Sequence, residues 1–115
     1  LSEPGVHGYQ SYVGREELRT GFADFYQAHY GVSLNAGTEI LPLMGSKEGI
    51  MHISMAFVNP GDKVLIPNPG YPTYSSVTEL VGGKAIYYRL TSEGLPDFDH
   101  IDARDLNEAM MMWVN

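Results

Sequence analysis

Apolar and polar positions along the chain follow two different periods, and each change of period marks an element that we expect. From Arg15 to Tyr30, apolar side chains recur every three or four residues, which predicts an amphipathic helix. Gly31 follows directly and is suited to end this helix. A second helix is expected from Ser46 to about Val58. Its apolar residues lie nearly all round, which indicates a helix that is buried on most sides or forms a subunit interface.

Short apolar runs separate these helices and predict strands at four places: residues 38–44, 63–67, 84–90 and 110–114. The last run is continuous, as in a parallel strand that is covered on both faces. A third helix is expected at 73–81 and a weakly helical crossover at 96–106. The alternation of strands and helices predicts an α/β fold of three layers, in which helices cover a largely parallel sheet.

A small-residue turn opens the second helix. The first N–H groups of a helix have no intrahelical acceptors, and the helix dipole adds positive potential at this end. Gly45 allows a ligand to approach the backbone closely, Ser46 offers a hydroxyl group, and Lys47 adds a charge. The turn therefore predicts an anion site, with phosphate as the natural ligand. The alternative is that Ser46 simply caps the helix and that Lys47 is a solvated surface charge.

Composition and charge exclude several classes of function. The 115 residues carry a net charge of −7, which argues against a general nucleic-acid or anionic-membrane surface. The chain contains no cysteine, which excludes disulfides and thiol catalysis and fits the reducing cytoplasm, where we expect the protein. The four histidines are scattered, and the aspartates at 97–105 lack the glycine and closing glutamate of an EF-hand. We therefore expect no metal site.

Several motifs together resemble the aspartate-aminotransferase-like family of pyridoxal-phosphate (PLP) enzymes, which have the type I fold. They run through nearly the whole chain: Tyr9 with Gly14-x-x-x-Leu18-Arg19, Gly45-Ser46-Lys47, Asn59-Pro-Gly-Asp62, and Pro69-Gly-Tyr71-Pro-x-Tyr74. One such motif would be weak evidence, but the ordered set is specific. The resemblance implies an N-terminal arm at 1–14, followed at 15–115 by part of a large, cofactor-binding domain that is truncated at both ends.

The resemblance also implies roles for individual residues. Gly45, Ser46 and Lys47 would hold the phosphate of PLP, and Tyr71 would stack on its pyridine ring. Tyr9 would reach the phosphate of the neighbouring subunit, which implies a homodimer. Lys47 departs from the hydroxyl residue that many relatives carry, but a cation there still suits phosphate. The alternatives are that Tyr71 is a proline-flanked surface aromatic and that Tyr9 belongs to an irregular arm.

The activity implied is transfer of an amino group between an amino acid and a 2-oxo acid. The family also uses a Schiff-base lysine, an aspartate at the pyridinium nitrogen and an arginine for the substrate carboxylate, and none of these is in the sequence. Lys63 and Lys84 do not replace that lysine, so we expect the chain alone to be inactive. Two alternatives remain: another type I fold PLP enzyme, such as a β-lyase, decarboxylase or synthase, or a non-catalytic α/β module that binds a phosphate or a partner.

Overall fold

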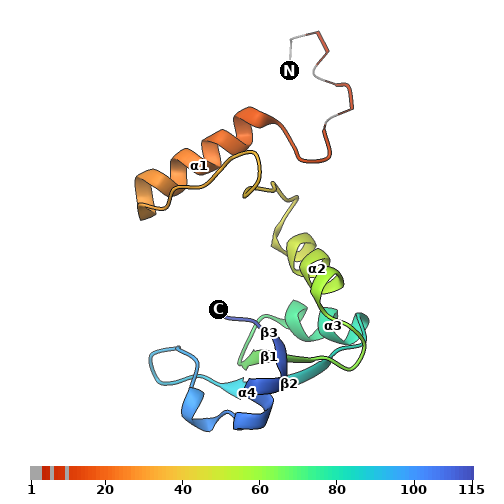
Figure 1. Ribbon diagram of the computed structural model, residues 1–115, viewed down its shortest axis with the longest axis vertical. Helices are drawn as coiled ribbons and strands as arrows, with labels where there is room; N and C mark the ends of the chain where they lie inside the picture. Colours follow the sequence, from red (N-terminus) through yellow and green to blue (C-terminus); the bar gives the residue numbers. More distant parts are fainter. Residues whose placement is uncertain (1–3, 6, 10) are drawn as a thin grey trace. The chain divides into compact units, whose positions relative to one another are not determined.

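The structure is a computed structural model that describes residues 4–5, 7–9 and 11–115. It divides the chain into two compact units, Leu1–Met44 and Gly45–Asn115. The first unit contains one helix, α1 (Glu16–Tyr30), among its described residues (Figure 1). The second contains the remaining elements: α2 (Ser46–Phe57), β1 (Lys63–Asn68), α3 (Pro72–Leu80), β2 (Lys84–Arg89), the 3-10 helix η1 (Phe98–His100), α4 (Ala103–Glu108) and β3 (Ala109–Met112).

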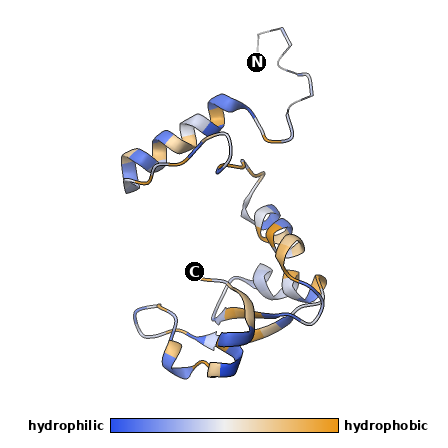
Figure 2. Cartoon of the chain, in the orientation of Figure 1, coloured by the Kyte–Doolittle hydropathy of each residue, from blue (hydrophilic) through white to orange (hydrophobic). Residues whose placement is uncertain are grey.

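Helix α1 begins at Glu16, one residue after the predicted start, and ends at Tyr30 as the sequence predicts. Hydrophilic and hydrophobic residues both recur along its length (Figure 2). Gly31 ends the helix in the left-handed conformation, with φ of 67°, and its N–H bonds to the carbonyl oxygen of Gln27. His29 stacks on Phe25 and lies 3.0 Å from the carbonyl oxygen of Phe25. This histidine therefore packs and hydrogen-bonds within its own helix.

The strand predicted at 38–44 does not form, and this prediction was wrong. Local turns satisfy the backbone instead: the N–H of Glu39 bonds to the carbonyl oxygen of Asn35, and the Glu39 carboxylate accepts from the N–H of Asn35. Pro42 has no N–H for a sheet ladder. Arg19 of α1 donates to the carbonyl oxygen of Ala36 at 3.0 Å. These bonds shape the start of the segment and the residues just before it, and the segment itself runs as a loop.

The second unit is built on a sheet of three parallel strands in the order β2-β1-β3. The chain moves from the central strand β1 to β2 at one edge of the sheet, and then passes back across the sheet to β3 at the other edge. Because parallel crossovers are almost always right-handed, α3 and α4 lie on opposite faces of the sheet, as Figure 1 shows. The predicted α/β fold, with a parallel sheet between covering helices, is confirmed.

The centre of this unit is β1, whose side chains are buried from Val64 to Pro67. Successive residues of a strand point to opposite faces, so burial at every position means that both faces are covered. Val64 and Ile66 form a core with Val58, against which side chains of α3, β2 and β3 pack. The turn before β1 has the Pro-Gly order that suits a type II turn, with Gly61 at φ of 92° and a bond from the N–H of Asp62 to the carbonyl oxygen of Asn59.

Helix α2 is less buried in this chain than its apolar sequence suggests. Its two buried residues are Ile50 and Ser54, and the Ser54 hydroxyl donates to the carbonyl oxygen of Ile50 at 2.8 Å. Three large apolar side chains on the rest of the helix are exposed by 45–61%: Ile53, Met55 and Phe57. Of the two predicted alternatives, burial on most sides is not found within this chain, and a subunit interface stays a prediction.

Candidate functional site

The loop that follows β1 lies at the carboxyl edge of the sheet, where open α/β sheets bind ligands. Gly70 determines its course. A Cβ atom at this position would lie 2.3 Å from the carbonyl oxygen of Pro67 and 2.9 Å from its Cγ, so only glycine fits. Tyr71 comes next, immediately before α3, with 37% of its surface exposed. The tight backbone at Gly70 therefore determines where the Tyr71 ring emerges.

The N-terminus of α2 provides the anion turn that the sequence predicts. Gly45 is the N-cap residue, with φ of 130°, and Ser46 is the first helical residue. As a glycine, the N-cap residue itself has no side chain that could bond to the first N–H groups. Apart from Gly45 and its two chain neighbours, no described atom lies within 4 Å of the position that a Cβ at Gly45 would occupy. The turn thus combines a helix N-terminus with open space beside its backbone, and Ser46 is not the N-cap.

The anion turn and the aromatic residue lie close together in the second unit. The Nζ atom of Lys47 is 6.0 Å from the centre of the Tyr71 ring. A positive charge and a half-exposed aromatic ring, which come from different helices, therefore lie beside one helix N-terminus. This arrangement suits a ligand that carries an anionic group next to a planar ring.

Tyr9, the remaining residue predicted for the site, lies in the first unit and is fully exposed. Its side chain therefore makes little contribution to packing within its own unit. The role predicted for it, at the phosphate of a neighbouring subunit, stays a prediction.

The other two lysines lie at the opposite edge of the sheet. Lys63 and Lys84 are register partners at the starts of β1 and β2. Lys63 also bonds to Asp105 and Glu108, at 2.7 Å each, and these hydrogen bonds raise its pKa. Because Tyr71 follows the other end of β1, neither lysine adjoins the Tyr71 ring. This placement agrees with the inference that neither of them replaces the missing lysine.

We expect stability to fall in acid because of Glu108. Hydrogen bonds from Lys63 and Arg104 lower the pKa of Glu108 from 4.5 to about 2. A carboxylate with a lowered pKa contributes stability above its ordinary pKa, and the contribution is lost as the pH falls from 4.5 toward 2. Glu108→Gln should therefore lower the urea midpoint at pH 6 and have little effect near pH 2. Glu93→Gln, on an exposed loop, is the control, and equal effects of the two variants at pH 6 would contradict this assignment.

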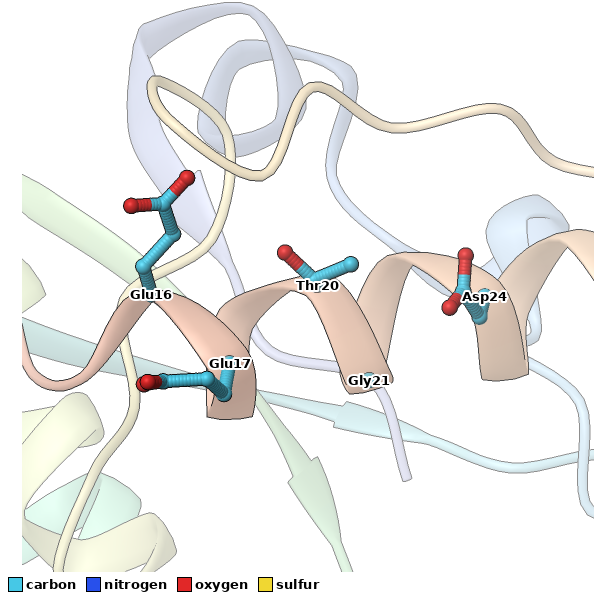
Figure 3. Close-up of a pocket in the computed structure, with 5 residues that line it drawn as sticks. All are labelled: Glu16, Glu17, Thr20, Gly21 and Asp24. Atoms are coloured by element: carbon cyan, nitrogen blue, oxygen red, sulfur yellow. The ribbon is translucent and has the colours of Figure 1, made fainter.

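A separate hollow of about 410 Å³ lies along α1 and is shown in Figure 3. Its lining is mostly acidic: Glu16, Glu17, Thr20, Gly21 and Asp24. Negative side chains repel phosphate, so this hollow is not suited to the ligand that the anion turn favours. Within the described part of the chain, no three side chains of the metal-binding types gather in one place. The described helices are all too short or too polar to cross a membrane.

Residues that sequence reasoning missed surround Tyr71. Tyr74 contacts the Tyr71 ring edge-on, with 5.7 Å between ring centres, and Trp113 stacks on Tyr74 at 4.8 Å. The Tyr88 hydroxyl donates to the carbonyl oxygen of Trp113 at 2.6 Å. The signal for Tyr74 was its place in the Pro-Gly-Tyr-Pro-x-Tyr motif. Trp113 and Tyr88 carried no signal, because their contacts depend on the sheet bringing distant segments together.

The family model and the relatives that match this chain all describe aminotransferases. Residues 1–112 match the family described as aminotransferase class I and II. The chain is 46% identical over 117 aligned positions to LL-diaminopimelate aminotransferase of Nitratidesulfovibrio vulgaris strain Miyazaki F, and 44% identical to the enzyme of that name from Aquifex aeolicus. All of this chain is aligned in both cases, and it spans about 30% of the length of these relatives.

Comparison with solved structures supports the same family. Substrate-bound BacF from Bacillus subtilis matches with a TM-score of 0.92 and 37% identity, over 99% of this chain and 30% of BacF. An aminotransferase from Staphylococcus aureus matches with a TM-score of 0.91 and 30% identity, over 98% of this chain and 30% of that protein. The family match covers nearly every residue, and the fold and ordered motifs accord with it. The chain therefore belongs to the class I and II aminotransferase family.

Proposed function

We propose that this chain is the part of a PLP-dependent aminotransferase that holds the cofactor. The observation that carries the proposal is the position of Lys47 beside the Tyr71 ring, at the N-terminus of α2. Phosphate and a pyridine ring are the two parts of PLP that a protein must hold, and these residues fit both. Membership of the aminotransferase family supports the same assignment.

In this proposal each residue has a physical task. The backbone at Gly45 and Ser46 leaves room for the phosphate, the N–H groups of the first turn of α2 point toward it, and Lys47 balances part of its charge. Tyr71 presents an aromatic surface that limits tilting of the pyridine ring. When bound, PLP supplies an electron sink that stabilises negative charge at the substrate Cα atom. Tyr9 contributes from the partner subunit of a homodimer, and the protein acts in the cytoplasm.

The proposed substrates are an amino acid and a 2-oxo acid. The relatives that are 44–46% identical are named LL-diaminopimelate aminotransferases, so LL-diaminopimelate is the first amino donor to test. Other substrates are known for proteins of similar fold: the alanine aminotransferase of Pyrococcus furiosus matches with a TM-score of 0.81 and 26% identity. The residues discussed above hold the cofactor rather than a substrate, so they favour no particular amino acid.

The cofactor itself provides the test of this proposal. We expect a full-length enzyme that contains this sequence to bind PLP, to be yellow, and to lose the colour when treated with borohydride. The 115-residue chain alone should show no transamination, because its lysines lie in the anion turn or at the far edge of the sheet. Transamination by the chain alone would contradict that assignment. Binding of inorganic phosphate by the full-length protein without binding of PLP would favour a phosphate-binding module instead.

A further inference from the structure

Three aromatic rings contact one another in turn at the carboxyl edge of the sheet, and a fourth residue, Tyr88, bonds to the backbone of the third. We call Tyr71, Tyr74, Trp113 and Tyr88 the aromatic stack. Tyr74 and Trp113 are nearly parallel, with 8° between their planes and 4.8 Å between ring centres. Tyr74 and Tyr71 are nearly perpendicular, at 84° and 5.7 Å. Both arrangements are favourable for aromatic pairs.

The stack runs from the core to the surface. Tyr88 is 2% exposed, and its hydroxyl donates to the carbonyl oxygen of Trp113. Tyr74 and Trp113 are half-buried and pack against the core that contains Val58, Val64 and Ile66. Tyr71, at the other end, is 37% exposed. The inner rings are therefore fixed by packing, and the outer ring is the one that a ligand can contact.

Ring contact is what orients the Trp113 indole. Its Nε1 atom is buried and has no acceptor among the described residues, so no hydrogen bond from the ring fixes the side chain. The Tyr88 hydroxyl bonds to the Trp113 backbone and fixes that end of β3, while the face of Tyr74 fixes the ring. Burial raises the pKa of Tyr88, so this hydroxyl keeps its proton as the donor at neutral pH.

We infer that Tyr74 is a positioning residue for the cofactor ring: backed by Trp113 and Tyr88, it holds Tyr71 in the orientation that receives the pyridine of PLP. The inference rests on the proposed function and adds the side chains that support it. The tight turn at Gly70 fixes where Tyr71 leaves the backbone, but its ring can still rotate. The perpendicular contact with Tyr74 restricts that rotation, so the ring is oriented before a ligand arrives.

The stack and the anion turn act on different parts of the ligand, and this separates a positioning role from a merely structural one. Loss of the Tyr74 ring should weaken binding of PLP, whose pyridine needs Tyr71. It should leave binding of inorganic phosphate unchanged, because phosphate needs only Gly45, Ser46 and Lys47. Damage to the fold as a whole would weaken both.

Tyr74→Leu and Tyr74→Phe form the matched pair for the test in the purified chain. Trp113 is the single tryptophan of the sequence, so its fluorescence reports ligand titrations at this site. For Tyr74→Leu we expect a dissociation constant for PLP that is about two- to tenfold higher, an unchanged one for phosphate, and a weaker near-ultraviolet circular dichroism band from the stacked rings. Tyr74→Phe keeps the ring and should behave as the wild type does in all three measurements.

Three outcomes would overturn the inference. Tyr74→Leu that binds PLP as tightly as the wild type shows that Tyr71 needs no support. Equal weakening of PLP and phosphate by Tyr74→Leu shows a general structural effect. If Tyr74→Leu does not fold, Tyr88→Phe replaces it: removal of that hydroxyl alone should weaken PLP binding and spare phosphate, and an unchanged affinity for PLP contradicts the inference. A full-length protein that binds phosphate but not PLP contradicts the proposed function itself.

Discussion

Replacing Gly70 with alanine should lower the free energy of unfolding by about 3 kcal/mol, a large effect for one methyl group. The added Cβ would lie 2.3 Å from the carbonyl oxygen of Pro67 and 2.9 Å from its Cγ. The first of these atoms belongs to the backbone, so the collision is not relieved by a change of rotamer. The loop between β1 and α3 must move, and Tyr71 moves with it. Urea unfolding followed by Trp113 fluorescence measures the loss, with a midpoint lower by roughly 1–2 M.

Gly21→Ala is the control for Gly70→Ala. Gly21 lies inside α1, and apart from its chain neighbours and the helix backbone around it no described atom lies within 4 Å of the position that its Cβ would occupy. Alanine there favours the helix by up to about 1 kcal/mol, so this variant should not be destabilised. Because Gly21 belongs to the other unit, the transition reported by Trp113 should remain where it is in the wild type. An unchanged midpoint for Gly70→Ala would show that the loop can relax and that glycine is not required.

Sequence patterns correctly predicted the elements whose conformation is determined by residues nearby in the sequence. Helix α1 follows from its period and from Gly31, and the turn at 59–62 follows from Pro60 and Gly61. The buried strand β1 follows from a continuous apolar run, because burial on both faces leaves no alternation. In each case the physical cause lies within a few residues of the element, so the sequence alone contains it.

The errors lie where a distant partner decides the outcome. Residues 38–44 read as a strand, but a strand requires a neighbouring strand, and Thr38 and Glu39 at the start of the segment bond to Asn35 instead. Helix α2 reads as buried on most sides or as part of a subunit interface; burial on most sides requires elements around it, and in this chain α3 is its main neighbour. An apolar surface shows that a helix can be covered; it does not show which element covers it.

The candidate site divides in the same way. The turn at Gly45, Ser46 and Lys47 was predicted from local chemistry, and the structure places a helix N-terminus there. The proximity of Lys47 to Tyr71 depends on how α2 and α3 pack, and the sequence indicated it only through resemblance to a family. The aromatic stack went unnoticed because Tyr88 and Trp113 come from segments distant from the motif that contains Tyr71 and Tyr74. Contacts between residues that are far apart in the sequence are thus the part of the site that is hardest to predict from the sequence.

Replacing Lys47 with glutamate should raise the dissociation constants for both PLP and inorganic phosphate by roughly 100-fold. The change removes a charge-assisted contact with the phosphate and puts a carboxylate where the anion binds. Lys47→Met, which removes the charge without reversing it, should weaken binding by about tenfold. Titration of Trp113 fluorescence with each ligand measures both effects, since Trp113 connects to the site through Tyr74 and Tyr71.

Lys84→Glu makes the same change in net charge at a different place, and so it separates a local effect from a general one. Lys84 is exposed at the start of β2, opposite the edge of the sheet where Tyr71 lies. The Lys84→Glu variant should weaken phosphate binding only slightly, because charges more than about 10 Å apart are screened at moderate ionic strength. Equal losses in Lys47→Glu and Lys84→Glu would mean that overall charge controls binding and that the α2 turn is not the phosphate site. A loss confined to Lys47→Glu for both ligands, alongside a loss confined to PLP in Tyr74→Leu, would assign the phosphate to the turn and the ring to the stack.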